Sequence, residues 1–365
     1  MSRYDLDERE LARLLDGEPP YRVAQVVHGL YRRLAEPAEL TDLPKSLRAR
    51  LAAAPELAPA LAVVREARAE GGQTLKWLFS LADGARIETV LLHAPSRSTV
   101  CVSSQAGCAM ACTFCATGQA GYERQLTAGE ILEQIVRAAR AAAAGGRRLD
   151  HVVFMGMGEP LANFDAVWDA TSRAVRHLGL SARHITISTV GVVPGIRRLA
   201  EAALPVNLAV SLHAANDELR DRLVPLNRRY PLAALRAACE EYLARRRRRI
   251  SFEWALIDGV NDAGADAAQL ARLAGPLRAH VNLIPLNPTA SGAAGGLAPS
   301  PPARVRAFRR ALEELGVNAT IRRTRGREID AACGQLAARA PTPRRDAPGA
   351  RTGGRSRPAR TEASG

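Results

Sequence analysis

The chain has 365 residues, of which 47% are hydrophobic and 24% charged, as in proteins with a substantial buried core. No apolar run is long enough to cross a membrane, and the acidic start MSRYDLDEREL is unlike a secretory signal, so we expect a cytoplasmic protein with no membrane partner. Lys and Arg exceed Asp and Glu by 14 residues, which suits a polyanionic partner such as nucleic acid. A GC-rich genome also enriches a sequence in arginine, so the charge alone leaves this partner open.

The order of predicted elements indicates an α/β fold. Apolar residues at helical spacing predict a small helical domain over residues 1–70, and 71–97 are expected to form a connecting β segment. Within 98–336, strand-like and helix-like segments alternate. The strand-like segments are 99–103, 152–155, 185–188, 206–211, 250–257, 281–284 and 319–322, and the helical ones 127–144, 164–178, 232–248, 265–277 and 302–315. Six or seven βα units are too few for a complete eight-stranded barrel, so we predict a partial barrel. The basic segment 337–365 has no apolar periodicity and is expected to be a disordered tail.

Three cysteines form the strongest motif, Cys108-Ala-Met-Ala-Cys112-Thr-Phe-Cys115. Thiolates at this spacing on a loop can ligate three irons of a cubane cluster and leave the fourth iron open. The alternative is structural zinc, which requires a fourth ligand nearby, and Cys101 lies seven residues upstream. Followed by Gly118, the motif resembles that of the radical S-adenosylmethionine (SAM) superfamily. There the amino and carboxylate groups of SAM bind the open iron, and one electron cleaves SAM to a 5′-deoxyadenosyl radical.

Polar or flexible residues follow the predicted strands at the end of the barrel where ligands bind. They are Gly158, Glu159, Ser188, Ser211, Leu212, His213 and Asn287. The glycine lets the backbone approach a ligand, and the carboxylate of Glu159 can bind an ammonium or hydroxyls. Taken singly, Gly158 could be a turn glycine and His213 a rim histidine. Their position on one predicted face favours cofactor binding.

Two further cysteines narrow the family. Cys101 begins Cys-Val-Ser-Ser-Gln before the cluster motif, and Cys333 lies in Asp-Ala-Ala-Cys-Gly-Gln-Leu near the end of the folded part. Both segments resemble those of the radical SAM RNA adenine methyltransferases of the RlmN and Cfr type, and the similarity extends to about residue 338. It implies a partial (β/α)6 radical SAM barrel with a small helical N-terminal accessory domain, a 4Fe-4S cluster and two SAM molecules per turnover.

The resemblance also assigns roles. In such enzymes the late cysteine accepts a methyl group from a first SAM, and a radical from a second SAM removes hydrogen from that methyl. The methylene radical adds to the adenine, and the early cysteine releases the product by forming a disulfide. This makes Cys333 the methyl carrier, Cys101 the resolving thiol and Glu88, in Arg-Ile-Glu-Thr-Val, the acceptor of the ring proton. Without the resemblance, both cysteines would be small buried residues and Glu88 a strand-edge charge; Cys239 is expected in the core.

Arginines near the end of the folded part are candidates for RNA contacts. Arg322, Arg323, Arg325 and Arg327 precede Cys333 and are expected to hold an RNA backbone. The run 245–249 closes a predicted helix and either contacts phosphate or remains a solvated helix end.

These features predict methylation of adenine C2 in 23S rRNA and in tRNA beside the anticodon. Cfr-type methylation of C8 of the rRNA adenine is the nearest alternative, and the segments 158–161 and 283–287 resemble the RlmN pattern more. A rival from another class is a non-catalytic RNA-binding protein with a structural metal site. The resemblance further implies an external electron donor, such as a flavodoxin, and a monomer.

Overall fold

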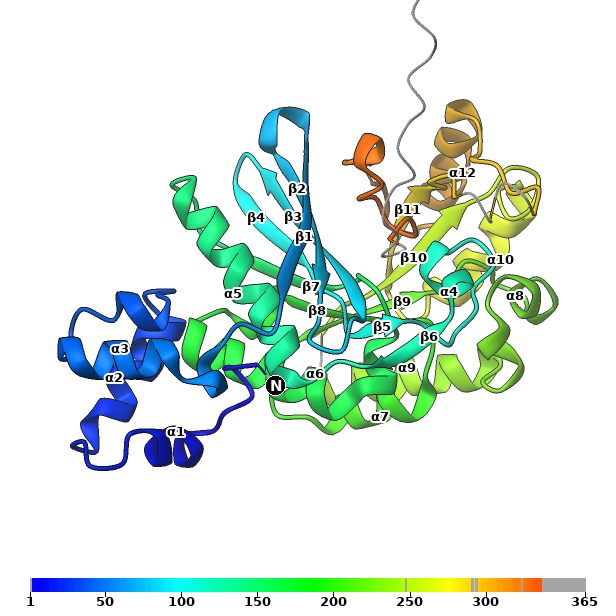
Figure 1. Cartoon of the computed structure of the whole chain (residues 1–365). Helices are drawn as coiled ribbons and strands as arrows, with labels where there is room; N and C mark the ends of the chain where they lie inside the picture. The colour runs from blue at the N-terminus through cyan, green and yellow to red at the C-terminus, as the bar shows by residue number, and fades with distance from the viewer. Residues whose placement is uncertain (1, 247, 290–291, 293–294, 323, 337–365) are drawn as a thin grey trace, which may run out of the picture.

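The computed structural model describes residues 2–246, 248–289, 292, 295–322 and 324–336. The predicted disordered tail, 337–365, lies outside the described residues, as do Arg247 and Arg323. Figure 1 shows helices at one end of the molecule, a layer of long antiparallel strands beside them, and a curved parallel sheet covered by helices. Within the described part, none of the helices is long and apolar enough to cross a membrane.

The described residues of 1–70, predicted to be a helical domain, are helical except for their last segment. They comprise α1 (Glu8–Leu14), α2 (Tyr21–Tyr31) and α3 (Lys45–Ala53). Residues 62–69, predicted within the helical domain, instead form strand β1 (Ala62–Ala69). This strand pairs with the next one through a turn in which Gly71 and Gly72 have positive φ angles of 64° and 85°, a conformation that glycine adopts without strain. The division into domains at 1–70, 71–97 and 98–336 stays a prediction.

Four strands form an antiparallel layer in chain order. They are β1, β2 (Thr74–Ser80), β3 (Arg86–Ala94) and β4 (Arg97–Cys101). Strand β4 also pairs in parallel with the first strand of the barrel, so the layer and the barrel share one ten-stranded sheet in the described part of the chain. The predicted connecting β segment is therefore a hairpin that extends the barrel sheet.

The parallel part confirms the predicted α/β fold. Its strands, in order across the sheet, are β4, β7 (His151–Phe154), β8 (Ile185–Thr189), β9 (Asn207–Ser211), β10 (Ile250–Leu256), β11 (His280–Pro285) and β12 (Ala319–Ile321). The helices that connect them are α5 (Ala128–Ala144), α6 (Phe164–Arg173), α7 (Val193–Glu201), α8 (Asp217–Leu223), α9 (Leu232–Arg246), α10 (Gly264–Ala274) and α12 (Pro302–Glu314). Because β1 and β12 end the strand order of the described sheet, the barrel is partial.

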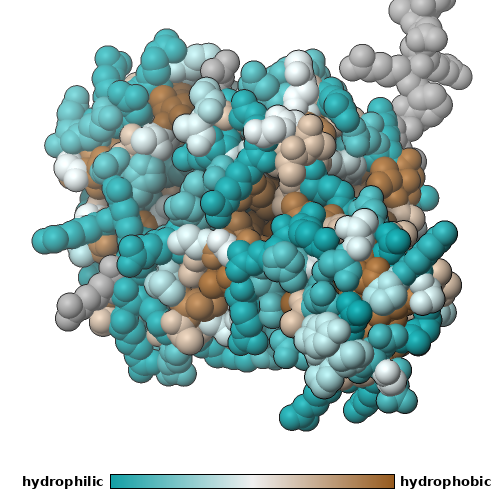
Figure 2. Space-filling model, turned by 90° about the vertical axis from the view of Figure 1, so that its left-hand side faces the viewer, coloured by the Kyte–Doolittle hydropathy of each residue, from teal (hydrophilic) through white to brown (hydrophobic). Residues whose placement is uncertain are grey.

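Helix α5 joins the N-terminal part to the barrel. Thr127 and Glu130 form a capping box at its start. Asp5 accepts hydrogen bonds from the Gly129 nitrogen at 2.7 Å and from Thr127 Oγ1 at 3.0 Å. One continuous set of buried apolar side chains runs from the N-terminal helices through α5 into the barrel strands. The face seen in Figure 2 is mainly hydrophilic, as expected of an outer surface, and its apolar side chains gather in small patches.

The segment after β12 returns to the antiparallel layer. The Gly326 nitrogen donates to Glu70 Oε1 at 2.7 Å, Arg325 donates to the His93 carbonyl, and Lys76 Nζ donates to the Asp330 carbonyl at 3.1 Å. In Figure 1 this orange segment lies between the antiparallel strands and β11. Residues from both ends of the sheet are thereby brought together over the barrel opening.

Candidate active site

The three motif cysteines lie on a tightly held loop, residues 108–121, which we call the cluster loop. It connects the paired strands β5 (Gln105–Gly107) and β6 (Tyr122–Gln125) and contains the short helix α4 (Ala116–Ala120). The Cys108 nitrogen donates to the Gly121 carbonyl at 2.7 Å and closes the base of the loop. A Cβ atom on Gly118 would lie 3.0 Å from the Cys112 nitrogen, which is tighter than ordinary van der Waals contact, so glycine is favoured where the loop folds onto itself.

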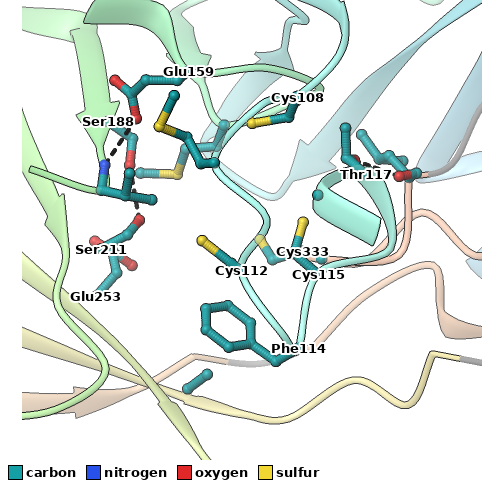
Figure 3. A pocket seen from close by; sticks show the side chains of 18 of the residues that line it. Cys108, Cys112, Phe114, Cys115, Thr117, Glu159, Ser188, Ser211, Glu253 and Cys333 are labelled. Atoms are coloured by element: carbon teal, nitrogen blue, oxygen red, sulfur yellow. Dashed lines mark hydrogen bonds between the residues drawn. The ribbon is translucent and has the colours of Figure 1, made fainter. Parts of the chain in front are cut away.

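The cluster cysteines, Cys108, Cys112 and Cys115, line a single cavity at the carboxyl ends of the barrel strands (Figure 3). Burial raises the pKa of Cys108 to about 12 and raises the pKa of Cys112 and Cys115 above the usual thiol value. Binding of these thiols to a metal therefore requires loss of their protons, which a positively charged iron centre favours.

The donor set fits an iron–sulfur cluster better than mononuclear zinc. Among the described residues, no three His, Cys, Asp or Glu side chains converge as the ligands of one metal ion do. Cys101, the candidate fourth zinc ligand, lies at the end of β4 and is not among the residues that line the cavity. Three thiolates spread around one cavity suit a cubane, in which each thiolate binds a different iron.

The predicted cofactor-binding residues gather around this cavity with one exception. Those that line it are Gly158, Glu159, Ser188, Ser211, His213 and Asn287. Leu212 is fully buried in the core, and its backbone nitrogen donates to the Glu253 carbonyl at 3.0 Å. Figure 3 shows Glu159, Ser188 and Ser211 on one side of the cavity and the cysteines on the other.

Glu159 is a buried carboxyl held by backbone donors. Its Oε2 accepts from the Val190 nitrogen at 2.9 Å and its Oε1 from the Leu161 nitrogen at 3.0 Å. Burial nevertheless raises the pKa of Glu159 to about 7. Gly158, with a φ angle of 97°, packs against Gln105, where a Cβ atom would lie 2.5 Å from the Gln105 Cβ. The pair therefore offers an acceptor beside a backbone that a ligand can approach closely.

His213 is a neutral imidazole in a fixed tautomer. Its Nδ1 lies 2.9 Å from the Ala255 nitrogen, whose N–H donates to it, so the ring proton resides on Nε2. Burial lowers the pKa of His213 to about 3, and the ring packs edge-on against Phe114 of the cluster loop at 4.5 Å between centroids. His213 therefore couples the end of β9 to the cluster loop.

Cys333 lies in the same cavity as the cluster cysteines. Its carbonyl accepts from Asn287 Nδ2 at 3.0 Å, and the nitrogen of Ala116 in the cluster loop donates to the carbonyl of the next residue, Gly334, at 2.8 Å. Cys101 and Cys333 are both free thiols in this structure, and Cys239 is buried in the core as predicted. Burial raises the pKa of Cys101 to about 12, with the Cys333 thiol adding to the rise and the Arg322 guanidinium opposing it.

Glu88 shares a face of the antiparallel layer with Cys101. Val90 is directly opposite Cys101, and Glu88 lies two residues from Val90, so both side chains point to the same side of the sheet. Lys76, opposite Val90 on the other side, places its Nζ 2.8 Å from Glu88 Oε1. Both side chains of this ion pair are largely buried, with 13% and 5% of their surface exposed.

Two charged residues of the cavity were not predicted in this role. Arg322, expected to contact an RNA backbone, lines the cavity, with its Nη1 3.9 Å from Met155 Sδ, and the charge of Cys333 is the largest factor that raises its pKa. Glu253 on β10 also lines the cavity and accepts from Asn282 Nδ2 at 2.7 Å and from Ser251 Oγ at 3.1 Å. A single acidic residue in the apolar segment Ile-Ser-Phe-Glu-Trp-Ala-Leu was a usable signal for the latter.

Comparison with known proteins first defines the class. Residues 102–271 match the Radical SAM superfamily. The barrel, the cluster loop and this match together define a radical SAM enzyme, in agreement with the predicted fold. Such an enzyme uses an iron–sulfur cluster and SAM.

Longer matches then define the family. A protein of Frankia alni named "Probable dual-specificity RNA methyltransferase RlmN" is 52% identical over 345 residues, which cover 91% of this chain and 81% of that protein. A protein of Chloroflexus aurantiacus with the same name is 48% identical over 356 residues, covering 93% of each chain. The crystal structure of a radical SAM methyltransferase from Sphaerobacter thermophilus matches with a TM-score of 0.88 at 50% identity and covers 93% of this chain and 100% of that chain.

The chain belongs to the RlmN family of radical SAM RNA methyltransferases. The predictions of family, fold, enzymatic class and RNA substrate are thereby confirmed. The alternative of an RNA-binding protein without catalytic activity is set aside.

Proposed function

We propose that this enzyme methylates C2 of adenine in 23S rRNA and in tRNA beside the anticodon, through a methyl-cysteine on Cys333. One observation carries the proposal: Cys333 lines the cavity of the cluster cysteines, and it lies close enough to Cys101 to raise the pKa of the Cys101 thiol. A methyl carrier must lie near the SAM site, and a resolving thiol must be able to reach the carrier.

The cavity residues divide the binding task. Cys108, Cys112 and Cys115 would hold a 4Fe-4S cluster, which supplies the electron that cleaves SAM. The residues proposed to bind SAM are Gly158, Glu159, Ser188, Ser211, His213 and Asn287, whereas Leu212 does not line the cavity and would support the site from the core. The Glu159 carboxylate suits the amino group of SAM, and the Nε2 proton of His213 can be donated to a SAM acceptor atom.

Three residues would perform the transfer itself, which uses two SAM molecules. Cys333 attacks the methyl of the first SAM, so that its sulfur gains the methyl and SAM loses it. The 5′-deoxyadenosyl radical formed from the second SAM would take a hydrogen atom from this methyl group, and the carbon would then bond to C2. The adduct would lose its unpaired electron to the oxidised iron–sulfur centre and its ring proton to Glu88, which leaves a closed-shell thioether. Cys101, as a thiolate, would then attack the Cys333 sulfur, forming a disulfide as the bond between that sulfur and the transferred carbon breaks, and the released carbon would take up a proton to become the methyl group.

The partners and setting complete the proposal. An external donor such as a flavodoxin would supply the electron, the enzyme would act as a monomer, and its RNA substrates place the reaction in the cytoplasm. The choice of C2 over C8 needs a test of its own, because Cfr-type methylation of C8 would use the same cysteines.

The test is analysis of the product. RNA incubated with the anaerobically prepared enzyme, SAM and a reductant is digested to nucleosides, which are compared by mass spectrometry with 2-methyl and 8-methyl adenosine standards. We expect 2-methyladenosine from rRNA and tRNA, and none from Cys333→Ala. 8-Methyladenosine would overturn the C2 assignment, and product from Cys333→Ala would overturn the methyl carrier.

A further inference from the structure

Arg220 carries a buried positive charge close to the cluster loop. It lies on α8 and is 1% exposed. Its guanidinium donates to the carbonyls of Val190 at 2.5 Å and Leu212 at 3.1 Å, and to Asn227 Oδ1 at 2.7 Å. These three acceptors and a fourth, the Ser211 carbonyl at 3.5 Å, are neutral, and within the described part of the chain the guanidinium forms no ion pair. A buried cation of this kind is costly unless an anion compensates it.

Two carboxylates, of Asp217 and Asp221, are linked to Arg220 by hydrogen bonds through the side chain of Asn227. Asn227 Nδ2 donates to Asp217 Oδ1 at 2.9 Å and to Asp221 Oδ1 at 2.7 Å, while its oxygen accepts from Arg220. Asp217 is exposed and Asp221 is partly exposed, so water screens much of their charge. They offset the charge of Arg220 in part.

The cluster loop packs against the same helix. The Thr113 nitrogen donates to the Leu223 carbonyl at 3.1 Å, and Cys112 shares an apolar cluster with Leu219 and Leu223 of α8. Burial lowers the pKa of Arg220 to about 10, and the charge of Cys112 is the largest factor that opposes this. Because the loop packs against α8 at Cys112 and Thr113, a cluster bound through Cys112 would add an anionic group close to Arg220.

We propose that Arg220 is the buried counter-charge of the iron–sulfur cluster and raises its reduction potential, in addition to fixing the ends of β8 and β9 through their carbonyls. Three thiolates make the cluster anionic, and reduction adds a further negative charge. A fixed cation in a low-dielectric environment stabilises the reduced form more than the oxidised one. The inference rests on the proposed ligation by Cys108, Cys112 and Cys115.

Two substitutions separate charge from hydrogen bonding. Arg220→Gln removes the charge and retains an amide donor, whereas Arg220→Lys retains the charge and loses the planar guanidinium. Arg222→Gln is the matched control, because Arg222 is an exposed residue of the same helix. The reconstituted enzymes are titrated with reductant without SAM, and the reduced cluster is followed by electron paramagnetic resonance. We expect a lower midpoint potential in Arg220→Gln and a near-native value in Arg220→Lys and Arg222→Gln.

A variant that retains Arg220 is expected to shift the midpoint potential in the opposite direction. Asp221→Asn retains an Oδ1 acceptor for Asn227 and removes one of the charges that offset Arg220, so its midpoint potential should rise. This variant decides the question if Arg220→Gln does not fold. Unchanged potentials in both Arg220→Gln and Asp221→Asn would overturn the inference and leave Arg220 a structural residue. Absence of iron and sulfide from the wild-type protein would instead overturn the proposed function.

Discussion

At the scale of single residues, burial changes the pH at which reactive side chains of the site ionise. Glu159 is 2% exposed and has a pKa of about 7, although a SAM ammonium or amine requires the ionised carboxylate as an acceptor. Lowering the pH through 7 adds a proton to the carboxyl and removes this negative charge. Its effect on ligand binding should therefore appear near neutral pH.

The first prediction concerns the pH dependence of SAM binding. The ratio of the SAM affinity of the wild type to that of Glu159→Gln should fall about tenfold per pH unit below about pH 7, because only the wild type loses a charge there. Taking the ratio cancels the titration of SAM itself. Equilibrium binding to the reconstituted enzyme between pH 5.5 and 8.5 measures it; a ratio that does not change with pH would show that Glu159 does not bind SAM as a carboxylate.

The second prediction tests whether the ion pair of Lys76 with Glu88 serves the later proton removal and not the transfer of methyl to Cys333. Lys76→Met removes the ammonium 2.8 Å from the buried Glu88 carboxylate and a hydrogen bond to the Asp330 carbonyl. Product formation should slow by roughly tenfold or more, as for an impaired general base. Methyl transfer to Cys333 should continue at the native rate, and Lys76→Arg should restore part of the activity. Equal losses in both steps would show that Lys76 serves the fold rather than the base.

At the scale of elements, the cluster loop depends on a close backbone contact. Gly118→Ala would bring a Cβ atom to 3.0 Å from the Cys112 nitrogen and 3.3 Å from the Cys112 carbonyl oxygen. We expect iron and sulfide per chain to fall well below the native content while the far-ultraviolet circular dichroism is retained. Gly264→Ala is the control, since nothing lies within 4 Å of a Cβ there. A native cluster content in Gly118→Ala would contradict this account of the loop.

The sequence predicts most strands of the barrel because they are short apolar runs in a repeating order. It does not predict α7, whose segment Val-Pro-Gly-Ile contains two residues that interrupt helices. Pro194 is tolerated because it lies in the first turn, where its missing N–H is not needed, and Gly195 packs where a Cβ atom would lie 2.6 Å from the Leu161 Cβ. Helix α7 is therefore stabilised by tertiary packing, which helix propensity alone does not predict.

The same reasoning applies to the site. The cysteine spacing and the resemblance identify the cluster loop and the outer cysteines, because these signals are local. The ion pair of Lys76 with Glu88 and the placement of Arg322 in the cavity depend on strand register and on the return of the C-terminal segment, which no local pattern encodes.

At the scale of the whole molecule, we expect the basic tail to contribute to RNA binding and the folded part to carry the chemistry. Residues 337–365 contain seven Arg, one Asp and one Glu. Removing them should weaken RNA binding at low salt and flatten its dependence on salt concentration, because fewer counterions are released. Methylation at saturating RNA should persist, since Cys333 precedes the deleted part. A truncated protein that retains its circular dichroism but cannot methylate at any RNA concentration would contradict this separation.

The fold as a whole brings together thiols that are 232 positions apart in the chain. Cys101 ends the first strand of the parallel sheet, and Cys333 returns from beyond its last strand to the same opening. The order in which these two thiols act is the central claim of the proposed mechanism.

Trapping of enzyme on RNA tests that claim most directly. Cys101→Ala should load a methyl group on Cys333 and attack the adenine, and then stall with enzyme and RNA joined through a thioether methylene. We expect an RNA-shifted protein band that survives denaturation and disappears after nuclease treatment, and no such band from Cys333→Ala or from the double variant. Normal turnover by Cys101→Ala, or a covalent adduct in Cys333→Ala, would contradict the account.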